Sequence, residues 1–244
     1  IYPRLATRYR TVAYDQRGHG KSGRATAYSL VDFGADAVRV VRQVVKGPTV
    51  VIGHSLGSLC AIAAAAEAPD LVVGLVLEDP PIAYSKNWDR DALSRMRDAL
   101  AGATDDKVLL RFVQGLPLAS PGPRGERTFG ESRGFYAAER VLTYYRDLDP
   151  AIPGSRAGQP DQPGIDALAE WLPKVKCPVL VIAGEPRLGS VLDDASEWKL
   201  KRAVKDLTVK RFPGTGHLIH GYRPEQFIEN VEPFLRRLRT PASV

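Results

Sequence analysis

A serine suited to nucleophilic chemistry stands at the centre of a Gly-x-Ser-x-Gly pattern, at Ser55. An apolar, β-branched run, Thr49 to Ile52, precedes it, and an Ala-rich stretch, Leu59 to Ala68, follows it. This order predicts a strand, a sharp turn and a helix that present the Ser55 hydroxyl above the end of a sheet. The N–H of Leu56, at the start of the helix, can then bind a developing oxyanion. A chance match in a loop is the other interpretation, and the flanking patterns argue against it.

A glycine-rich segment, Asp15 to Gly23, lies upstream of this serine and predicts a compact loop. It reads Asp-x-Arg-Gly-x-Gly-x-Ser, and one helix, expected from Leu30 to Val45, separates it from the serine motif. The two motifs, in this order, resemble those of the α/β-hydrolase superfamily. The resemblance implies an α/β fold with a mostly parallel sheet flanked by helices, an inserted helical cap, and hydrolysis without a cofactor or metal. Arg17 and His19 are interpreted as residues that fix the loop.

The resemblance also implies a histidine that acts as general base for Ser55. The chain has four histidines. His217 follows a Gly-x-Gly turn after the last expected strand, as the catalytic histidine does in that superfamily. His220 is the weaker candidate for the base and is otherwise expected to bind substrate or to cover the loop. His54, beside the serine, is expected to be structural or to line the substrate site.

The carboxylate that orients the histidine is not where most of the superfamily has it. The strand at Val179 to Ile182 would normally end in Gly-x-x-Asp, but the sequence here is Gly-Glu-Pro-Arg, with Arg187 in place of the acid. An arginine only donates hydrogen bonds and has the wrong charge to orient an imidazole. A branch of the haloalkane dehalogenases and fungal lactonases instead carry the acid after the strand that follows the nucleophile helix. That position here is Asp79, 24 residues after Ser55.

Glu78 is the alternative acid, and because alternate strand residues face opposite ways, we expect only one of the two to reach the histidine. If Asp79 merely binds loop amides, the remaining candidates are Glu185, Asp193 and Asp194.

The resemblance further implies a second oxyanion N–H, from a His-Gly segment that would precede Ile1, and a strand between those at Thr11 to Tyr14 and Thr49 to Ile52. Neither is present in the 244 residues. Unpaired strand edges inside a sheet are costly. We therefore expect the chain to be a fragment, or a processed or split polypeptide.

Apolar periodicity predicts the other core elements. A helix ends within Ile1 to Arg10; further strands are expected at Val72 to Leu77, Val179 to Ile182 and Leu207 to Phe212, and helices at Asp194 to Val204 and Pro224 to Leu238. We expect residues 1–81 and 174–244 to form the core domain and residues 82–173 to form the cap.

Amphipathic helices separated by Gly/Pro-rich loops predict the cap, at Arg90 to Ala101, Lys107 to Gly115 and Phe135 to Arg146. Among its aromatic residues, Trp88, Tyr136 and Trp171 are candidates to line a substrate pocket, with packing inside the cap as the other interpretation.

Composition narrows the class of protein. The 34 basic and 28 acidic residues are spread along the chain, which gives little support for nucleic-acid binding. We expect no membrane segment and no leader. Cys60 and Cys177 do not form a disulfide framework, so a reducing, cytoplasmic location is expected. Composition does not predict the oligomeric state.

The sequence thus predicts a serine hydrolase whose partner is a small-molecule ester or lactone, with the lactone weakly favoured by the position of Asp79. Carbon–carbon bond hydrolysis by the same triad is possible, whereas dehalogenase and epoxide hydrolase chemistry needs an aspartate in place of Ser55. A non-catalytic protein that binds a small apolar ligand beneath the cap is the alternative from another class.

Overall fold

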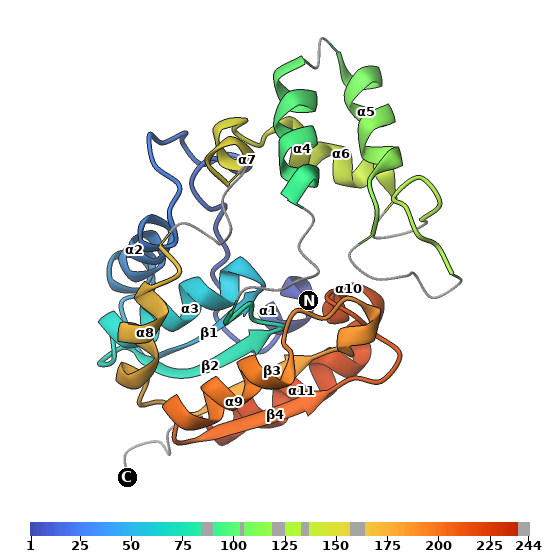
Figure 1. The fold of residues 1–244 in the computed structure, drawn as a ribbon. Helices are drawn as coiled ribbons and strands as arrows, with labels where there is room; N and C mark the ends of the chain where they lie inside the picture. Colours follow the sequence, from blue (N-terminus) through green and yellow to red (C-terminus); the bar gives the residue numbers. More distant parts are fainter. Residues whose placement is uncertain (84–89, 103–104, 119–124, 133–136, 157–163, 239–244) are drawn as a thin grey trace.

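The computed structural model describes residues 1–83, 90–102, 105–118, 125–132, 137–156 and 164–238 (Figure 1). A parallel sheet with the strand order β1-β2-β3-β4 lies at its centre. The strands are β1 (Thr49–His54), β2 (Val72–Glu78), β3 (Val179–Ala183) and β4 (Leu207–Arg211). Because the strands run the same way, their carboxyl ends meet at one edge of the sheet, where ligand sites of open α/β sheets form.

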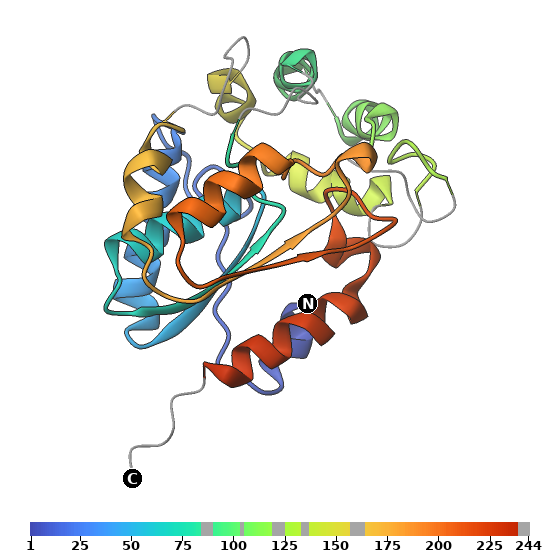
Figure 2. The ribbon, with the colours of Figure 1, turned by 60° about the horizontal axis from the view of Figure 1, so that its bottom comes forward.

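Helices cover both faces of the sheet, as Figure 2 shows. On one face lie α2 (Leu30–Val40), the π-helical turn η1 (Val41–Val45), α3 (Leu56–Glu67), α8 (Ala167–Trp171), the short η3 (Leu172–Lys174) and α9 (Asp194–Ala203). On the other face lie α1 (Tyr2–Ala6) and α11 (Pro224–Arg237). The predicted fold class, a parallel sheet flanked by helices, is confirmed.

The side chains of the central strands alternate between the two faces. Leu75 and Leu77 of β2 pack into the cluster around α3, whereas Val76 packs into the cluster that contains Phe227 and Val231 of α11. β3 is buried along its whole length. A strand that is apolar on both faces is typical of a parallel sheet covered by helices, which is why these runs could be found in the sequence.

The residues expected to form a cap include four helices above the carboxyl edge of the sheet (Figure 1). They are α4 (Arg90–Gly102), α5 (Asp106–Gly115), α6 (Ala138–Arg146) and α7 (Ala151–Arg156). α5 and α6 share an apolar cluster that includes Leu109, Val113 and Val141, and Leu218 and Tyr222 pack against this cluster. α5 and α6 are therefore in contact with the segment that follows His217. α8, which was expected to belong to the cap, packs on the core side against α3.

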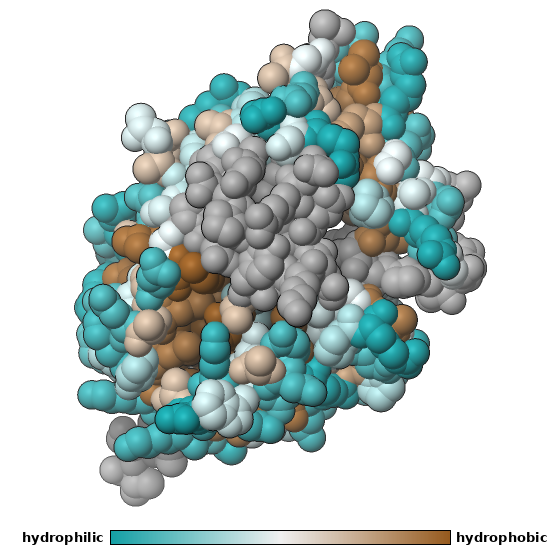
Figure 3. Space-filling model, in the orientation of Figure 1, coloured by the Kyte–Doolittle hydropathy of each residue, from teal (hydrophilic) through white to brown (hydrophobic). Residues whose placement is uncertain are grey.

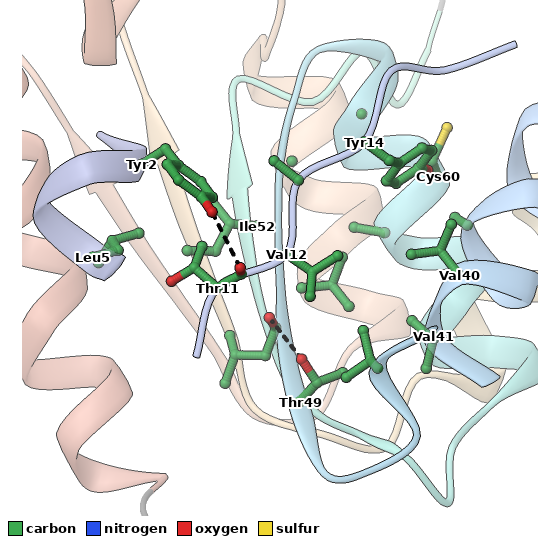
Figure 4. A pocket seen from close by; sticks show the side chains of 18 of the residues that line it. Tyr2, Leu5, Thr11, Val12, Tyr14, Val40, Val41, Thr49, Ile52 and Cys60 are labelled. Atoms are coloured by element: carbon green, nitrogen blue, oxygen red, sulfur yellow. Dashed lines mark hydrogen bonds between the residues drawn. The ribbon is translucent and has the colours of Figure 1, made fainter. Parts of the chain in front are cut away.

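Residues 11–14 do not form the expected strand, because no neighbouring strand pairs with them. A cavity of about 1210 Å³ is lined both by this segment and by β1 (Figure 4). Val12 and Tyr14 border it and are 39% and 41% exposed, which a paired interior strand would not be. Residues 11–14 do have the apolar pattern of a strand, but a strand also requires hydrogen bonds to a neighbouring strand.

Hydrophilic side chains cover most of the periphery of the face seen in Figure 3.

Within the described residues, no helix combines the length and the apolar character that a membrane crossing requires.

Candidate active site

Ser55 connects β1 directly to α3, and its backbone is strained. It has φ +52° and ψ −120°, a region that non-glycine residues rarely adopt. A Cβ at Gly53 would clash with the carbonyl group of Gly57, so a glycine is needed there, whereas a Cβ at Gly57 would meet open space. The N–H of Leu56, the first residue of α3, has no carbonyl partner within the helix and can serve an external oxygen. Such strain, about 1 to 3 kcal/mol, is found where a fold must present a functional group.

Asp79 follows β2 directly and is fully buried, again with a positive φ of +44°. Its Oδ1 accepts hydrogen bonds from the Ser190 hydroxyl at 2.5 Å and the Leu192 N–H at 3.3 Å. Its Oδ2 accepts one from the Val191 N–H at 2.9 Å and one from His217 Nδ1 at 2.6 Å. Four donors compensate the burial of this carboxylate, which would otherwise be costly.

The hydrogen bond to Asp79 determines which ring nitrogen of His217 carries the proton. A carboxylate only accepts, so Nδ1 is the donor and Nε2 is left as an acceptor. Within the residues that the structure describes, the Ser55 hydroxyl and His217 are not joined by a hydrogen bond. Such bonds commonly tighten only when substrate binds. The arrangement is that of a histidine oriented for use as a base.

The turn after β3, where most of the superfamily would have the acid, supports the loop that carries His217. The Glu185 N–H donates to the Thr215 carbonyl at 2.7 Å, and the Glu185 carboxylate accepts from the Gly214 N–H at 2.7 Å. That bond from Gly214, together with the bond from Arg187, lowers the pKa of Glu185. A Cβ at Gly184 would clash with the carbonyl oxygens of Thr215 and Gly216, so the two turns are in direct contact.

A second carboxylate–histidine pair lies beside the first. Glu78 is 2% exposed, and its Oε1 accepts from the backbone N–H of His220 at 2.8 Å while its Oε2 accepts from His220 Nδ1 at 2.7 Å. Burial raises the pKa of Glu78, but the hydrogen bonds and charge of His220 and the charge of His54 outweigh burial, so the net shift is downward. Of the two consecutive acids, only Asp79 contacts His217, as the alternation of strand residues predicts, and Glu78 contacts His220 instead.

His54 packs between the two loop histidines. Its ring centroid is 4.5 Å from that of His217 and 5.3 Å from that of His220, and its Nε2–H donates to the His217 carbonyl at 2.9 Å. Burial, followed by the nearby charge of His217, lowers the pKa of His54 to about 4. His54 is therefore neutral near pH 7 and holds the backbone of His217.

The remaining candidate acids have other partners in the described residues. Glu185 pairs with Arg187, the Asp193 side chain caps the N-terminus of α9, and Asp194 is fully exposed beside Arg211. None of them contacts His217.

Of the three predicted substrate-binding aromatics, the structure describes Trp171, which is not brought to this site. Trp171 is buried in the core, where its ring lies against Gly34 of α2, so it is a core residue rather than a pocket residue. Trp88 and Tyr136 lie outside the described residues. In the upstream loop, Arg17 binds Asp36 at 2.6 and 2.9 Å and His19 contacts the Arg17 carbonyl, as expected for residues that fix the loop.

No sequence pattern singles out Ser190, although its hydroxyl donates to Asp79. It is one serine in an ordinary Gly-Ser-Val-Leu segment, and only the tertiary fold brings it to the end of β2, 111 residues earlier in the chain.

Comparison with known proteins agrees with this geometry. A family model described as the alpha/beta hydrolase fold matches residues 1–224. The chain belongs to the α/β-hydrolase family. Several relatives of this α/β-hydrolase are themselves named as hydrolases or lipases.

One relative is the 2-(acetamidomethylene)succinate hydrolase of Mesorhizobium japonicum, 28% identical over 95% of this chain and 80% of that protein. Another is the human monoglyceride lipase, 28% identical over 87% of this chain and 67% of the lipase. Among solved structures, that of E-2-(acetamidomethylene)succinate hydrolase aligns with a TM-score of 0.68 at 25% identity and covers 96% of this chain and 84% of its own.

Proposed function

We propose that this α/β-hydrolase cleaves carboxylic esters or lactones through an acyl-enzyme formed on Ser55. The observation that supports the proposal most directly is the 2.6 Å hydrogen bond between the buried Asp79 and His217, at the sheet edge where Ser55 is presented. A base oriented by a buried acid beside a strained serine is the arrangement used for acyl transfer.

In the proposed reaction, His217 Nε2 removes the proton from the Ser55 hydroxyl as its oxygen attacks the acyl carbon. The resulting oxyanion accepts a hydrogen bond from the Leu56 N–H, aided by the positive end of α3. His217 then gives the proton to the leaving alkoxide. In the second half, His217 activates a water that attacks the acyl-enzyme, the carboxylic acid leaves and the Ser55 hydroxyl is restored. Asp79 keeps Nδ1 protonated and stabilises the positive charge on the ring.

Hydrolysis of an N-acyl amide is the second candidate function. The 2-(acetamidomethylene)succinate hydrolase, whose name contains an acetamido group, aligns over 95% of this chain. The same serine chemistry applies to amides, with an amine as the leaving group. Carbon–carbon bond hydrolysis by the same triad stays a prediction.

Covalent labelling with a fluorophosphonate tests the nucleophile without knowledge of the substrate. The probe should modify Ser55, identified by mass spectrometry of the tryptic peptide, and Ser55→Ala should remain unlabelled while folded by circular dichroism. A panel of p-nitrophenyl acetate, a simple γ-lactone and an N-acetyl enamide then separates the candidate substrate classes. A folded protein that is neither labelled nor turns over any of the three would support the non-catalytic, ligand-binding alternative instead.

A further inference from the structure

The Glu78–His220 pair is a hydrogen-bonded contact to a buried carboxylate that the proposed reaction does not use. The carboxylate accepts two hydrogen bonds from one residue, one from its backbone and one from its ring, at 2.8 and 2.7 Å. Only 3% of the Glu78 side chain is exposed, compared with 26% of His220. The burial of an ionised carboxylate is costly in desolvation unless its partners compensate it. A gain in net stability therefore does not account for the Glu78–His220 contact, and the position of this contact in the fold has to be explained.

That position is next to the proposed catalytic pair on both sides of the contact. Glu78 immediately precedes Asp79, and His220 lies three residues after His217, in the short helix α10 (Ile219–Tyr222). The end of β2 thus holds one loop at two points, through Asp79 at His217 and through Glu78 at His220.

His54 links these two points. Its ring packs against both loop histidines, and its Nε2–H holds the carbonyl of His217. A shift of His220 would therefore move the surface on which His54 packs, and with it the backbone of His217. A displacement of a base by about 1 Å can cost about a hundredfold in rate.

We propose that Glu78 and His220 are positioning residues: their paired hydrogen bonds fix the loop so that the His217 ring faces Ser55. This inference rests on the proposed function. His220 acts here through its Nδ1–H and its backbone, not as a proton carrier. The requirement is for a donor at the Nδ1 position, which an asparagine amide nitrogen can also occupy.

Two substitutions at His220 separate positioning from other roles. His220→Asn keeps a donor for Glu78, whereas His220→Ala removes it. We expect fluorophosphonate labelling of Ser55 to slow by about ten- to a hundredfold in His220→Ala and to stay within about threefold in His220→Asn. With p-nitrophenyl acetate, kcat should fall while KM changes little. If His220→Ala does not fold, His220→Gln replaces it, because its donor lies one bond farther out.

Tyr28→Phe is the matched control. It removes another buried hydrogen bond to a carboxylate, from Tyr28 to Asp149 at 2.6 Å, in a part of the chain that does not contact the loop. It should lower Tm and leave the labelling rate within about twofold.

Proton NMR of protein with 15N-labelled histidine supplies a readout that does not depend on catalysis. The His217 Nδ1–H resonance should be observable in the wild type and His220→Asn, and lost to exchange in His220→Ala. Loss of labelling in the wild type would refute the proposed function alone. An unchanged resonance and labelling rate in folded His220→Ala would refute positioning, as would a His220→Asn variant as slow as His220→Ala.

Discussion

Two consecutive carboxylates at the end of β2 bind two histidines of one loop, yet they are stabilised in different ways. Asp79 accepts three hydrogen bonds from Ser190, Val191 and Leu192 in addition to the one from His217. Within the described residues, the Glu78 carboxylate accepts hydrogen bonds from His220 alone.

The difference separates a reactive pair from a fixed one. Because three donors outside the histidine hold the Asp79 carboxylate, His217 can gain and lose a proton at Nε2 while the acid stays in place. Glu78 has no comparable support within the described residues, so its carboxylate depends on the His220 contact. The Asp79–His217 pair is therefore suited to repeated proton transfer in the proposed reaction, and the Glu78–His220 pair is suited to holding the loop in one position.

The largest expected effect comes from Asp79→Asn. The amide can no longer fix the protonated Nδ1 tautomer of His217, and loss of the orienting acid in a serine triad costs about 10⁴-fold in kcat. Steady-state hydrolysis of p-nitrophenyl acetate measures the loss, with circular dichroism as the check on folding. If Glu78→Gln lost as much activity as Asp79→Asn, and more than its loss of stability explains, the assignment of the two pairs would be contradicted.

Glu78→Gln should have a smaller effect, about tenfold in kcat, because the loop shifts but the triad remains. The variant also tests the pH dependence of stability. The folded-state pKa of Glu78 is lowered below its ordinary value of 4.5, so the ionised group stabilises the fold above that pH and the contribution is lost as the pH falls through the folded-state pKa. Urea unfolding should show wild type and variant converging in stability below about pH 4.5. A constant difference down to pH 2.5 would contradict this assignment.

Ser190→Ala removes one donor from the buried Asp79 and should cost about 1.5 to 3 kcal/mol in the free energy of unfolding, since the acceptor is charged. We expect a several-fold decrease in kcat with little change in KM. Thr143→Ala serves as the control because its hydroxyl bonds to the Arg140 carbonyl on an exposed helix, and it should change stability by less than about 0.5 kcal/mol. Equal effects of the two substitutions would show that Asp79 does not depend on its loop donors.

The smallest effect concerns His54. Its pKa falls from 6.5 to about 4 on folding, so the unfolded chain binds the proton more tightly and stability decreases as the pH falls from 6.5 towards 4. The decrease should amount to about 1 to 3 kcal/mol. His54→Gln should remove this part of the pH dependence, as measured by urea unfolding at pH 7, 6, 5 and 4. A wild-type profile as flat as that of the variant would contradict it.

Much of the fold could be read from the sequence because buried parallel strands and amphipathic helices leave strong local patterns. β2 was expected at Val72 to Leu77 and runs to Glu78, and α11 was expected at Pro224 to Leu238 and ends at Arg237. The strand expected at residues 11–14 was wrong because pairing is a property of two segments, and no local pattern reports whether the partner is present.

The residues of the candidate site could be predicted from the sequence only where they stand in a known motif or at a known spacing from one. Ser55 and His217 stand in recognisable turns, and Asp79 follows from its distance along the chain from Ser55. The alternation rule also separated Glu78 from Asp79, and only Asp79 contacts His217. The rule did not indicate that Glu78 would contact a second ring of the same loop, His220. The donor at Ser190 and the positive φ of Asp79 depend on tertiary contacts, so the sequence could not indicate them.

The hydrogen bonds to Asp79 from the segment after β3 connect chain regions more than a hundred residues apart. The acid and the groups that solvate it are therefore brought together only when β2 has paired with β3, which follows it about a hundred residues later in the chain. In a partly folded chain, Asp79 would be exposed to water and could not orient His217. Hydrolytic competence should thus arise late in folding, together with the completed sheet, and an immature chain would be protected from premature reaction.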